Sequence, residues 1–387
     1  MDLLHYFDPV DFEKFECADW ANKKLSLGAL LQKNQEKLKT DKAELVIIGV
    51  CEDRNSMVTG AGKAPDEIRK YLYNLNRISP RFKILDLGNL KIGHTANDSY
   101  FALRDICEHI LENHQTIIVL GGSQDLTFGM TKAFDGRLFN MVTVDPILDF
   151  RKGVKSLNSE NYLNLIFEKQ KNLYSYTALA YQNYFVDPTE IDQYNNYHWE
   201  LKRLGQVRYD LTSVEPILRD AHIFSFDLNA VRYMDAPGQS MASPNGLYSE
   251  EACQISRYAG SSDELNVAGF FNLMPEKDLS SNSTNLMAQI VWHFMEGFIN
   301  RKPEDPSEDS EDFNQFMVDM SDISMTLVFF QSRISGRWWM EISDFENRKG
   351  DIYIIPCDED DYKKASHGDI PDRWWKNIRK MHKRQNK

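Results

Sequence analysis

Short apolar runs recur through the middle of the chain and alternate with segments of helical periodicity. The first run, Glu44–Val50 (ELVIIGV), is almost wholly apolar, which is typical of a parallel strand buried on both faces. Strands that alternate with helices predict βαβ units and a mainly parallel, doubly wound sheet. We therefore predict an α/β fold with three layers, α/β/α. Further strands are expected at Lys83–Leu87, Thr116–Leu120, Phe139–Val144, His222–Phe226 and Leu265–Phe271, and helices at Pro65–Leu75, Ser99–Asn113 and Asn285–Ile299.

Composition divides the chain into segments around this core. Residues 1–43 are polar and Lys-rich, with a helix expected from about Ala29 to Lys39. The α/β core spans residues 44–300 and includes a less regular insert, residues 151–220, rich in Tyr and Asn. The end of this insert, Tyr209–Arg219, resembles a helix.

The last part of the chain has a different character. Residues 301–312 carry two prolines and six acidic residues, which indicates an acidic linker. Residues 313–387 form an aromatic-rich extension that includes Trp338, Trp339, Trp374 and Trp375. These tryptophans either pack the extension onto the core or form a docking surface for a protein partner. We expect antiparallel strands at Met325–Gln331, Arg337–Ile342 and Asp351–Ile355, and a closing helix at Pro371–Met381.

Charge and cysteine usage restrict the partners and the compartment. The chain has 45 basic and 58 acidic residues, a net charge of -13, which disfavours sequence-independent binding to nucleic acid. The basic tail Lys376–Lys387 is expected to be a solvated terminus. No apolar run approaches the ~20 residues that a membrane span needs. The five scattered cysteines and the absence of a leader-like start predict a cytoplasmic protein.

Polar residues follow three of the predicted strands, where ligands bind in sheets of this class. Asp145 and Asp149 project to one face of extended chain, and Asp227 and Asn229 do the same after another strand. Converging carboxylates need a cation, a donor or a proton between them. These oxygens could ligate a hard cation, or they could cap helices and fix loops. The turn after the Thr116–Leu120 strand, Gly121-Gly-Ser-Gln-Asp125, is expected to be structural.

The order of the motifs resembles the ureohydrolases, the family of arginase, agmatinase and formimidoylglutamase. The resemblance covers about residues 44–300. The segments Gly60-Ala-Gly-Lys-Ala-Pro-Asp-Glu-Ile-Arg69 and Leu85-Asp-Leu-Gly88 resemble the start of the family's first long helix and its second strand. Leu120-Gly-Gly-Ser-Gln-Asp125 stands for Gly-Gly-Asp-His-Ser, and Val144-Asp-Pro-Ile-Leu-Asp149 for Asp-Ala-His-x-Asp. The family's Ser-x-Asp-x-Asp motif corresponds to Ser225-Phe-Asp-Leu-Asn229. Its Ala-Pro-Gly and Gly-Gly-Leu motifs correspond to Ala236-Pro-Gly238 and Asn245-Gly-Leu247. Its strand that ends in Glu-x-Asn-Pro corresponds to Gly269–Pro275.

The resemblance implies a metal site that this sequence has altered. Ureohydrolases hold two manganese ions with four aspartates and two histidines, and the ions activate a shared hydroxide. Asp145, Asp149 and Asp227 are retained. The two histidines are replaced by Gln124 and Ile147, the last aspartate by Asn229, and the glutamate of the final motif by Asn272. A single divalent cation, such as manganese, on the three aspartates is still compatible with the sequence, whereas a pair of ions is not expected.

Three functions follow from these replacements. The first is a catalytically defective ureohydrolase homologue that acts as a binding or assembly protein, with a protein partner on the Trp-rich extension or a homo-oligomeric assembly. The alternative is a metal-dependent C–N hydrolase that acts on a linear amidine or guanidino compound through an altered or single-metal site. A third is a sensor of small molecules. Asp125 is expected to cap the next helix, and His222 to be structural.

Overall fold

The computed structural model describes residues 3–11, 24–29, 31–33, 43–79, 81–151, 157–197, 199–307, 310–320, 325–342 and 352–385. Most of the helix predicted at Ala29–Lys39 lies outside these residues. Within that range, Gln32–Lys33 form a short strand, β2, beside β4 (Ile84–Leu90). No helix in the described part of the chain is long and apolar enough to cross a membrane. The cytoplasmic location stays a prediction.

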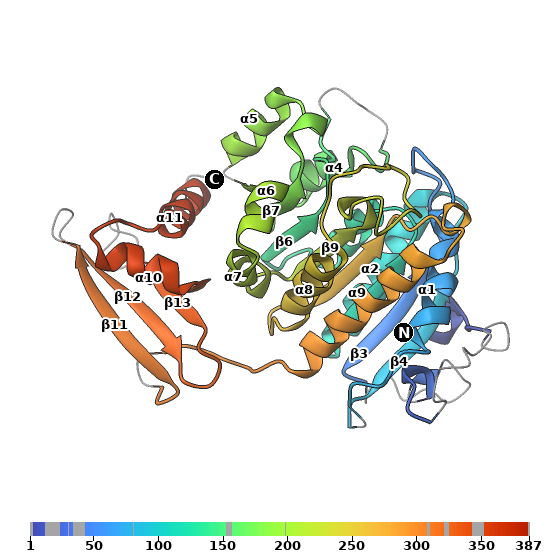
Figure 1. Cartoon of the computed structure of the whole chain (residues 1–387), viewed down its shortest axis with the longest axis horizontal. Helices are drawn as coiled ribbons and strands as arrows, with labels where there is room; N and C mark the ends of the chain where they lie inside the picture. The colour runs from blue at the N-terminus through green and yellow to red at the C-terminus, as the bar shows by residue number, and fades with distance from the viewer. Residues whose placement is uncertain are drawn as a thin grey trace.

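A mainly parallel sheet forms the centre of the molecule and confirms the predicted fold class (Figure 1). Its strand order is β1-β4-β3-β5-β10-β9-β6-β7-β8, and the pairs from β4 to β8 are all parallel. Only β1 (Phe7–Asp8) runs antiparallel, against β4. The other strands are β3 (Leu45–Val50), β5 (Thr116–Gly121), β6 (Phe139–Val144), β7 (Leu173–Tyr181), β8 (Glu200–Arg203), β9 (Ile223–Asp227) and β10 (Val267–Phe271).

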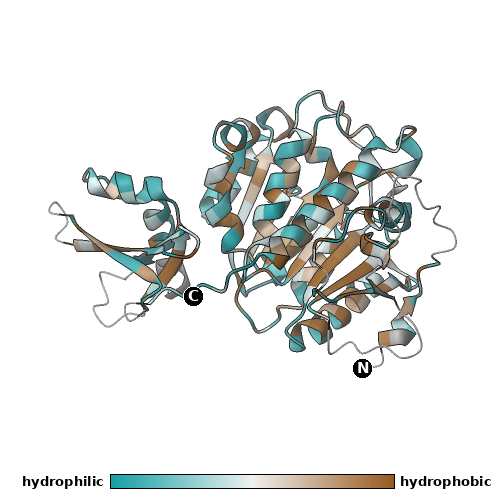
Figure 2. Cartoon of the chain, turned by 60° about the horizontal axis from the view of Figure 1, so that its bottom comes forward, coloured by the Kyte–Doolittle hydropathy of each residue, from teal (hydrophilic) through white to brown (hydrophobic). Residues whose placement is uncertain are grey.

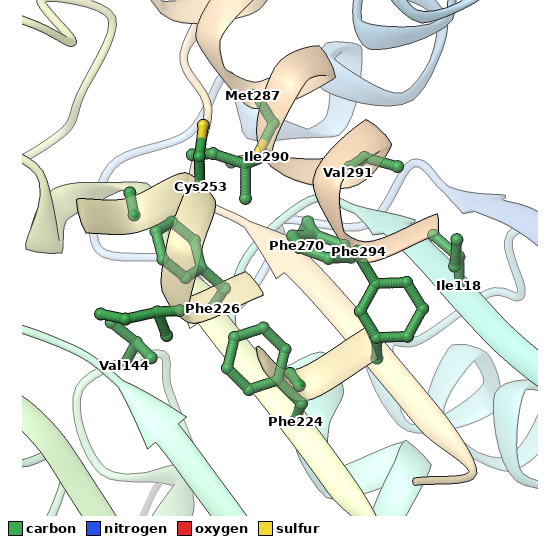
Figure 3. Close-up of a cluster of buried hydrophobic side chains, with 14 of the residues drawn as sticks. Ile118, Val144, Phe224, Phe226, Cys253, Phe270, Met287, Ile290, Val291 and Phe294 are labelled. Atoms are coloured by element: carbon green, nitrogen blue, oxygen red, sulfur yellow. The ribbon is translucent and has the colours of Figure 1, made fainter. Parts of the chain in front are cut away.

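Alternate residues of each central strand feed two hydrophobic cores, one on each face of the sheet. Leu45 and Ile47 of β3 belong to one core, whereas Val46 and Ile48 belong to the other. The first core lies against α1 (Ala64–Leu72), α8 (Ser249–Gly260) and α9 (Asn282–Ile299), and the second against α2 (Ala96–Glu112), α3 (Leu126–Lys132) and α4 (Tyr162–Lys169). Figure 3 shows part of the first core. Helices on both faces confirm the three layers.

Two strands of the sheet lie in the segment described above as an insert. β7 and β8 extend the sheet beyond β6, and the predicted helix Tyr209–Arg219 is instead divided between the end of α6 (Leu204–Tyr209), a short 3-10 turn and α7 (Glu215–Arg219). β7 reads LYSYTALAY, so polar groups interrupt its apolar pattern. The structure accommodates them because the hydroxyl groups of Tyr176 and Thr143 pair inside the core, 2.7 Å apart. α5 (Pro188–Tyr197) lies between the two strands in the chain.

The C-terminal extension is a separate antiparallel sheet (Figure 1). It confirms the three predicted strands as β12 (Met325–Ser332), β13 (Trp338–Ile342) and β14 (Tyr353–Cys357), and the closing helix as α11 (Asp372–Gln385). The strand β11 (Phe313–Met320) and the helix α10 (Glu359–Ser366) were not predicted. The extension has a hydrophobic core of its own, which includes Trp338 and Trp374. Figure 2 shows this smaller unit beside the larger core, whose central strands are mostly hydrophobic.

Polar contacts attach the extension to the core. Arg219 of α7 is 2% exposed and donates through Nη2 to the carbonyl oxygens of Trp338 and Cys357, at 3.0 Å each. The same guanidinium group lies 4.3 Å from the centre of the Trp339 ring. From α11, Lys376 Nζ lies 3.0 Å from Glu200 Oε1 of β8. Three of the four tryptophans of the extension are buried, and Trp375 is exposed.

Candidate functional site

The predicted site residues lie together at the C-terminal edge of the sheet. The order β5-β10-β9-β6 makes these four strands neighbours. Parallel strands end at the same edge of the sheet, so the residues that follow them meet. Gln124 follows β5, Asn272 follows β10, Asp227 ends β9 and Asp145 follows β6. All four side chains are buried. The sequence placed these groups at strand ends, and the fold brings them into contact.

Asp227 is surrounded by N–H donors. Its Oδ1 accepts from the backbone N–H of Asn229 at 2.7 Å. Its Oδ2 accepts from the side-chain nitrogens of Asn272 at 2.8 Å and Asn229 at 3.2 Å. Burial raises the pKa of Asp227 to about 6, although the hydrogen bonds from Asn229 and Asn272 act in the opposite direction. The carboxyl group is held by neutral donors, with no cationic side chain among its contacts.

Gln124 joins Asp227 to Asp145. With its amide oxygen and nitrogen assigned from the surrounding donors and acceptors, Nε2 donates to Asp145 Oδ2 at 2.7 Å and to Asp227 Oδ2 at 3.2 Å, while its oxygen accepts from the Ser225 hydroxyl at 3.2 Å. This orientation is favourable because it places the nitrogen, and not the oxygen, against the two carboxyl groups. Asp227 Oδ2 therefore accepts three N–H groups, and its carboxyl group four in total.

Asp145 and Asp149 lie within hydrogen-bonding contact of each other. Asp145 Oδ1 accepts from the Ile147 backbone N–H at 2.9 Å, and a side-chain hydrogen bond joins the two aspartates. A hydrogen bond between carboxyl groups requires a proton on one of them. Burial and the charges of nearby aspartates raise the pKa of both groups well above the ordinary value. The Oδ1 atom of Asp149 has no hydrogen-bond partner within the described part of the chain.

Tyrosines that the sequence analysis did not assign to the site pack beside this pair. Tyr162, Tyr176 and Tyr194 are all 1% exposed or less. Burial and the charges of Asp149 and Asp145 raise the pKa values of Tyr162 and Tyr194, so both phenols stay protonated. The high tyrosine content of residues 151–220 was the only sequence signal for these tyrosines beside the two aspartates.

Asp125 and His222 were also assigned roles from the sequence, and the structure shows the contacts of both. Asp125 occupies the N-cap position immediately before α3, but its side chain does not cap the helix. Instead, Asp125 accepts a hydrogen bond from the Tyr100 hydroxyl of α2, so the predicted capping role is wrong. His222 lies at the opposite end of β9, where its Nδ1 accepts from the Asn140 backbone N–H at 3.1 Å. Burial lowers the pKa of His222 to about 4, so it is a neutral structural residue.

The donor set does not fit a pair of manganese ions. Asp227 is surrounded by N–H groups, with three on Oδ2 and one on Oδ1, so Oδ2 has no lone pair left for a metal ion. Ile147 provides no ligand atom in its side chain. Among the residues that the structure describes, no group of three or more His, Cys, Asp and Glu side chains is arranged to hold a metal ion. We derive no chemical step through a metal from this arrangement.

The chain is similar in sequence and in structure to known proteins of one family. The sequence model of the Arginase family matches residues 43–296. A formimidoylglutamase of Staphylococcus haemolyticus is 21% identical over 304 residues, which cover 74% of this chain and 94% of that protein. A manganese-bound formiminoglutamase of Trypanosoma cruzi superposes with a TM-score of 0.65 at 21% identity, over 72% of this chain and 99% of the other. The formimidoylglutamase of Bacillus subtilis gives a TM-score of 0.67 at 15% identity, over 73% and 95% of the two chains.

Proposed function

Because the chain belongs to the arginase family, we propose that it keeps the ureohydrolase fold without the dinuclear manganese chemistry and acts as a binding or assembly protein. The observation that carries this proposal is the set of contacts made by Asp227, whose carboxyl group is occupied by amide and backbone N–H groups. A metal-bound water is the nucleophile that the family's chemistry needs at neutral pH. Amide groups do not act as Lewis acids, so they cannot replace that function.

An activity assay tests the proposal directly. The full chain is equilibrated with excess manganese and given formimidoylglutamate, arginine, agmatine or guanidinobutyrate, and the release of formamide or urea is measured. We expect no turnover above the uncatalysed rate. The formimidoylglutamase of Staphylococcus haemolyticus, assayed in parallel, provides the positive control. Manganese-dependent turnover of any of the four compounds would contradict the proposal.

A second candidate is a C–N hydrolase that acts on a linear amidine through an altered site. The comparisons favour this candidate over the first, because the named relatives are formimidoylglutamases and the match spans most of their length. If turnover is found, Asp227→Ala should abolish it. Asp135→Asn, which changes an exposed carboxylate after α3, should leave it unaltered. Equal rates in wild type and Asp227→Ala would exclude a role for the cluster in catalysis.

The binding or assembly role is supported by the architecture of the extension. A folded C-terminal sheet joined to the core through residues 301–312 offers a surface separate from the carboxyl cluster. Trp375 on α11 is 42% exposed, whereas Trp338, Trp339 and Trp374 are buried. We therefore expect a protein partner, or a second copy of the chain, to contact Trp375 if it contacts a tryptophan of the extension.

A further inference from the structure

We infer that Gln124, Asn229 and Asn272 act together as an amide cage that takes the place of a divalent cation and excludes it. This inference rests on the proposed function and deepens it, because it identifies the residues that make metal binding unfavourable. The three amides come from loops after three different strands, β5, β9 and β10, and all three converge on Oδ2 of Asp227.

The side-chain amides of Gln124 and Asn229 have a second contact, and Asn272 is positioned by its backbone. The Gln124 oxygen accepts from Ser225. The Asn229 oxygen accepts from the backbone N–H of Met241 at 3.0 Å, which leaves its nitrogen directed at Asp227. Asn272 has a left-handed backbone, with φ at 63°, and its N–H donates to the Gly122 carbonyl at 2.9 Å. Asn tolerates this conformation better than most residues. The donors are therefore positioned in advance of any ligand.

A cation cannot join this cluster without breaking it. A divalent ion needs carboxylate lone pairs, and Oδ2 of Asp227 already accepts three donors that are held in place. Displaced amide N–H groups would be left buried without acceptors, which costs about 1–3 kcal/mol each. Asn229 is the member that stands where the ureohydrolase motif has an aspartate, and its nitrogen lies 3.2 Å from Asp227 Oδ2. An aspartate at position 229 would place a second carboxylate at that distance, and a cation would then be favoured between the two.

Thermal unfolding with and without manganese chloride tests the cage. In the wild-type chain we expect the same Tm, within about 1 °C, in manganese and in EDTA. Asn229→Asp should lower the Tm in EDTA by about 5 °C or more, and manganese should restore most of that loss. The matched control is Asn195→Asp, which adds the same charge on the exposed face of α5 and should show no response to manganese. If Asn229→Asp does not fold in EDTA, Gln124→His provides the second test, with a manganese-dependent rise in Tm again expected.

The outcomes separate this inference from the proposed function. A wild-type Tm that rises with manganese, or a stoichiometry of one or more ions per chain after removal of free metal, would overturn the cage even if no turnover is found. Failure of manganese to stabilise both Asn229→Asp and Gln124→His would also overturn it. Turnover without bound metal would overturn the proposed function and leave the cage intact. Manganese-dependent stability in the variants alone is the result that supports it.

Discussion

Carboxylates are buried in two regions of this molecule, and different groups stabilise them in each. At the C-terminal edge of the main sheet, Asp227 is held by amide and backbone N–H groups, and burial raises its pKa to about 6. Between core and extension, Glu200 faces cations. Burial would raise the pKa of Glu200, but the positive charges of Lys376, Arg373 and Lys380 outweigh burial and lower the pKa to about 2. Neutral donors thus leave ionisation of a buried acid unfavourable, whereas cationic partners make it favourable.

The two arrangements also differ in how they depend on single residues. Several neutral donors share the charge of Asp227, so that loss of one leaves the others in place. Beside the interface, cations of α11 balance single acids: Lys376 pairs with Glu200 of β8 in the core, and Arg373 pairs with Asp361 of α10 within the extension. Removal of one partner of a buried ion pair leaves an uncompensated charge. We therefore expect larger effects from substitutions at the interface than at the candidate site.

Replacement of Arg373 should have the largest effect. Arg373 Nε donates to Asp361 Oδ2 at 3.0 Å, and its side chain is 16% exposed. In Arg373→Met the acids around it lose their buried cation, and we expect the extension to lose about 3–5 kcal/mol of stability. Urea unfolding followed by tryptophan fluorescence measures this, because four of the seven tryptophans lie in the extension. Arg379→Met, at an exposed position of the same helix, is the control and should lose less than about 0.5 kcal/mol. Equal losses of stability in the two variants would show that Arg373 contributes no more than an exposed arginine of the same helix.

The sequence predicted the parts of the fold that depend on local patterns. Unbroken apolar runs identified β3 and β5 because strands buried on both faces need no polar residues. The pattern failed at β7, where Tyr176 and Thr143 satisfy each other's hydroxyl groups across neighbouring strands. The strand β11 has residues of alternating exposure, and its alternation of apolar and polar residues was not recognised as a strand.

The candidate site was predictable in its location but not in its contacts. Asp145, Asp149 and Asp227 follow strands, and the parallel topology brings such residues to one edge. The sequence allowed Gln124 to hydrogen-bond the carboxylates, but which of them it contacts depends on the distances between β5, β6 and β9, which no local pattern encodes. The contact of Asp125 also depends on the tertiary structure, because its partner Tyr100 lies in α2, 25 residues earlier in the chain.

The pH dependence of the interface is the next, somewhat smaller effect. The pKa of Glu200 is about 2 in the folded chain against an ordinary value of 4.5, so its ionised form stabilises the folded state. This contribution is complete above pH 4.5 and is lost as the pH falls toward 2. We expect Glu200→Gln to lower stability by about 3 kcal/mol at pH 7, and the gap from wild type to narrow below pH 4.5. Urea unfolding of both chains at pH 7, 5, 4 and 3 measures the gap. A gap that is independent of pH would mean that Glu200 contributes by packing and not by charge.

The contribution of Asp227 to stability should have the opposite dependence on pH. Its folded pKa of about 6 lies above the ordinary value of 3.8, so its contribution to stability is present at low pH and is lost as the pH rises through 6. The difference in sign arises because burial outweighs the neutral donors at Asp227, whereas the ammonium and guanidinium groups around Glu200 outweigh burial.

The smallest effect should come from removing a single amide of the cage. Asn272→Gly deletes one of the four N–H donors of Asp227 and keeps a residue that tolerates the backbone φ of 63°. Because three donors remain, we expect a loss of only about 1–2 kcal/mol, measured by urea unfolding of the core. His114→Gly, at an exposed position with φ of 57°, controls for the change to glycine in a left-handed conformation and should be close to neutral. If Asn272→Gly lost as much stability as Arg373→Met, the three remaining donors would not compensate for the missing one. The contrast between the two regions would then not hold.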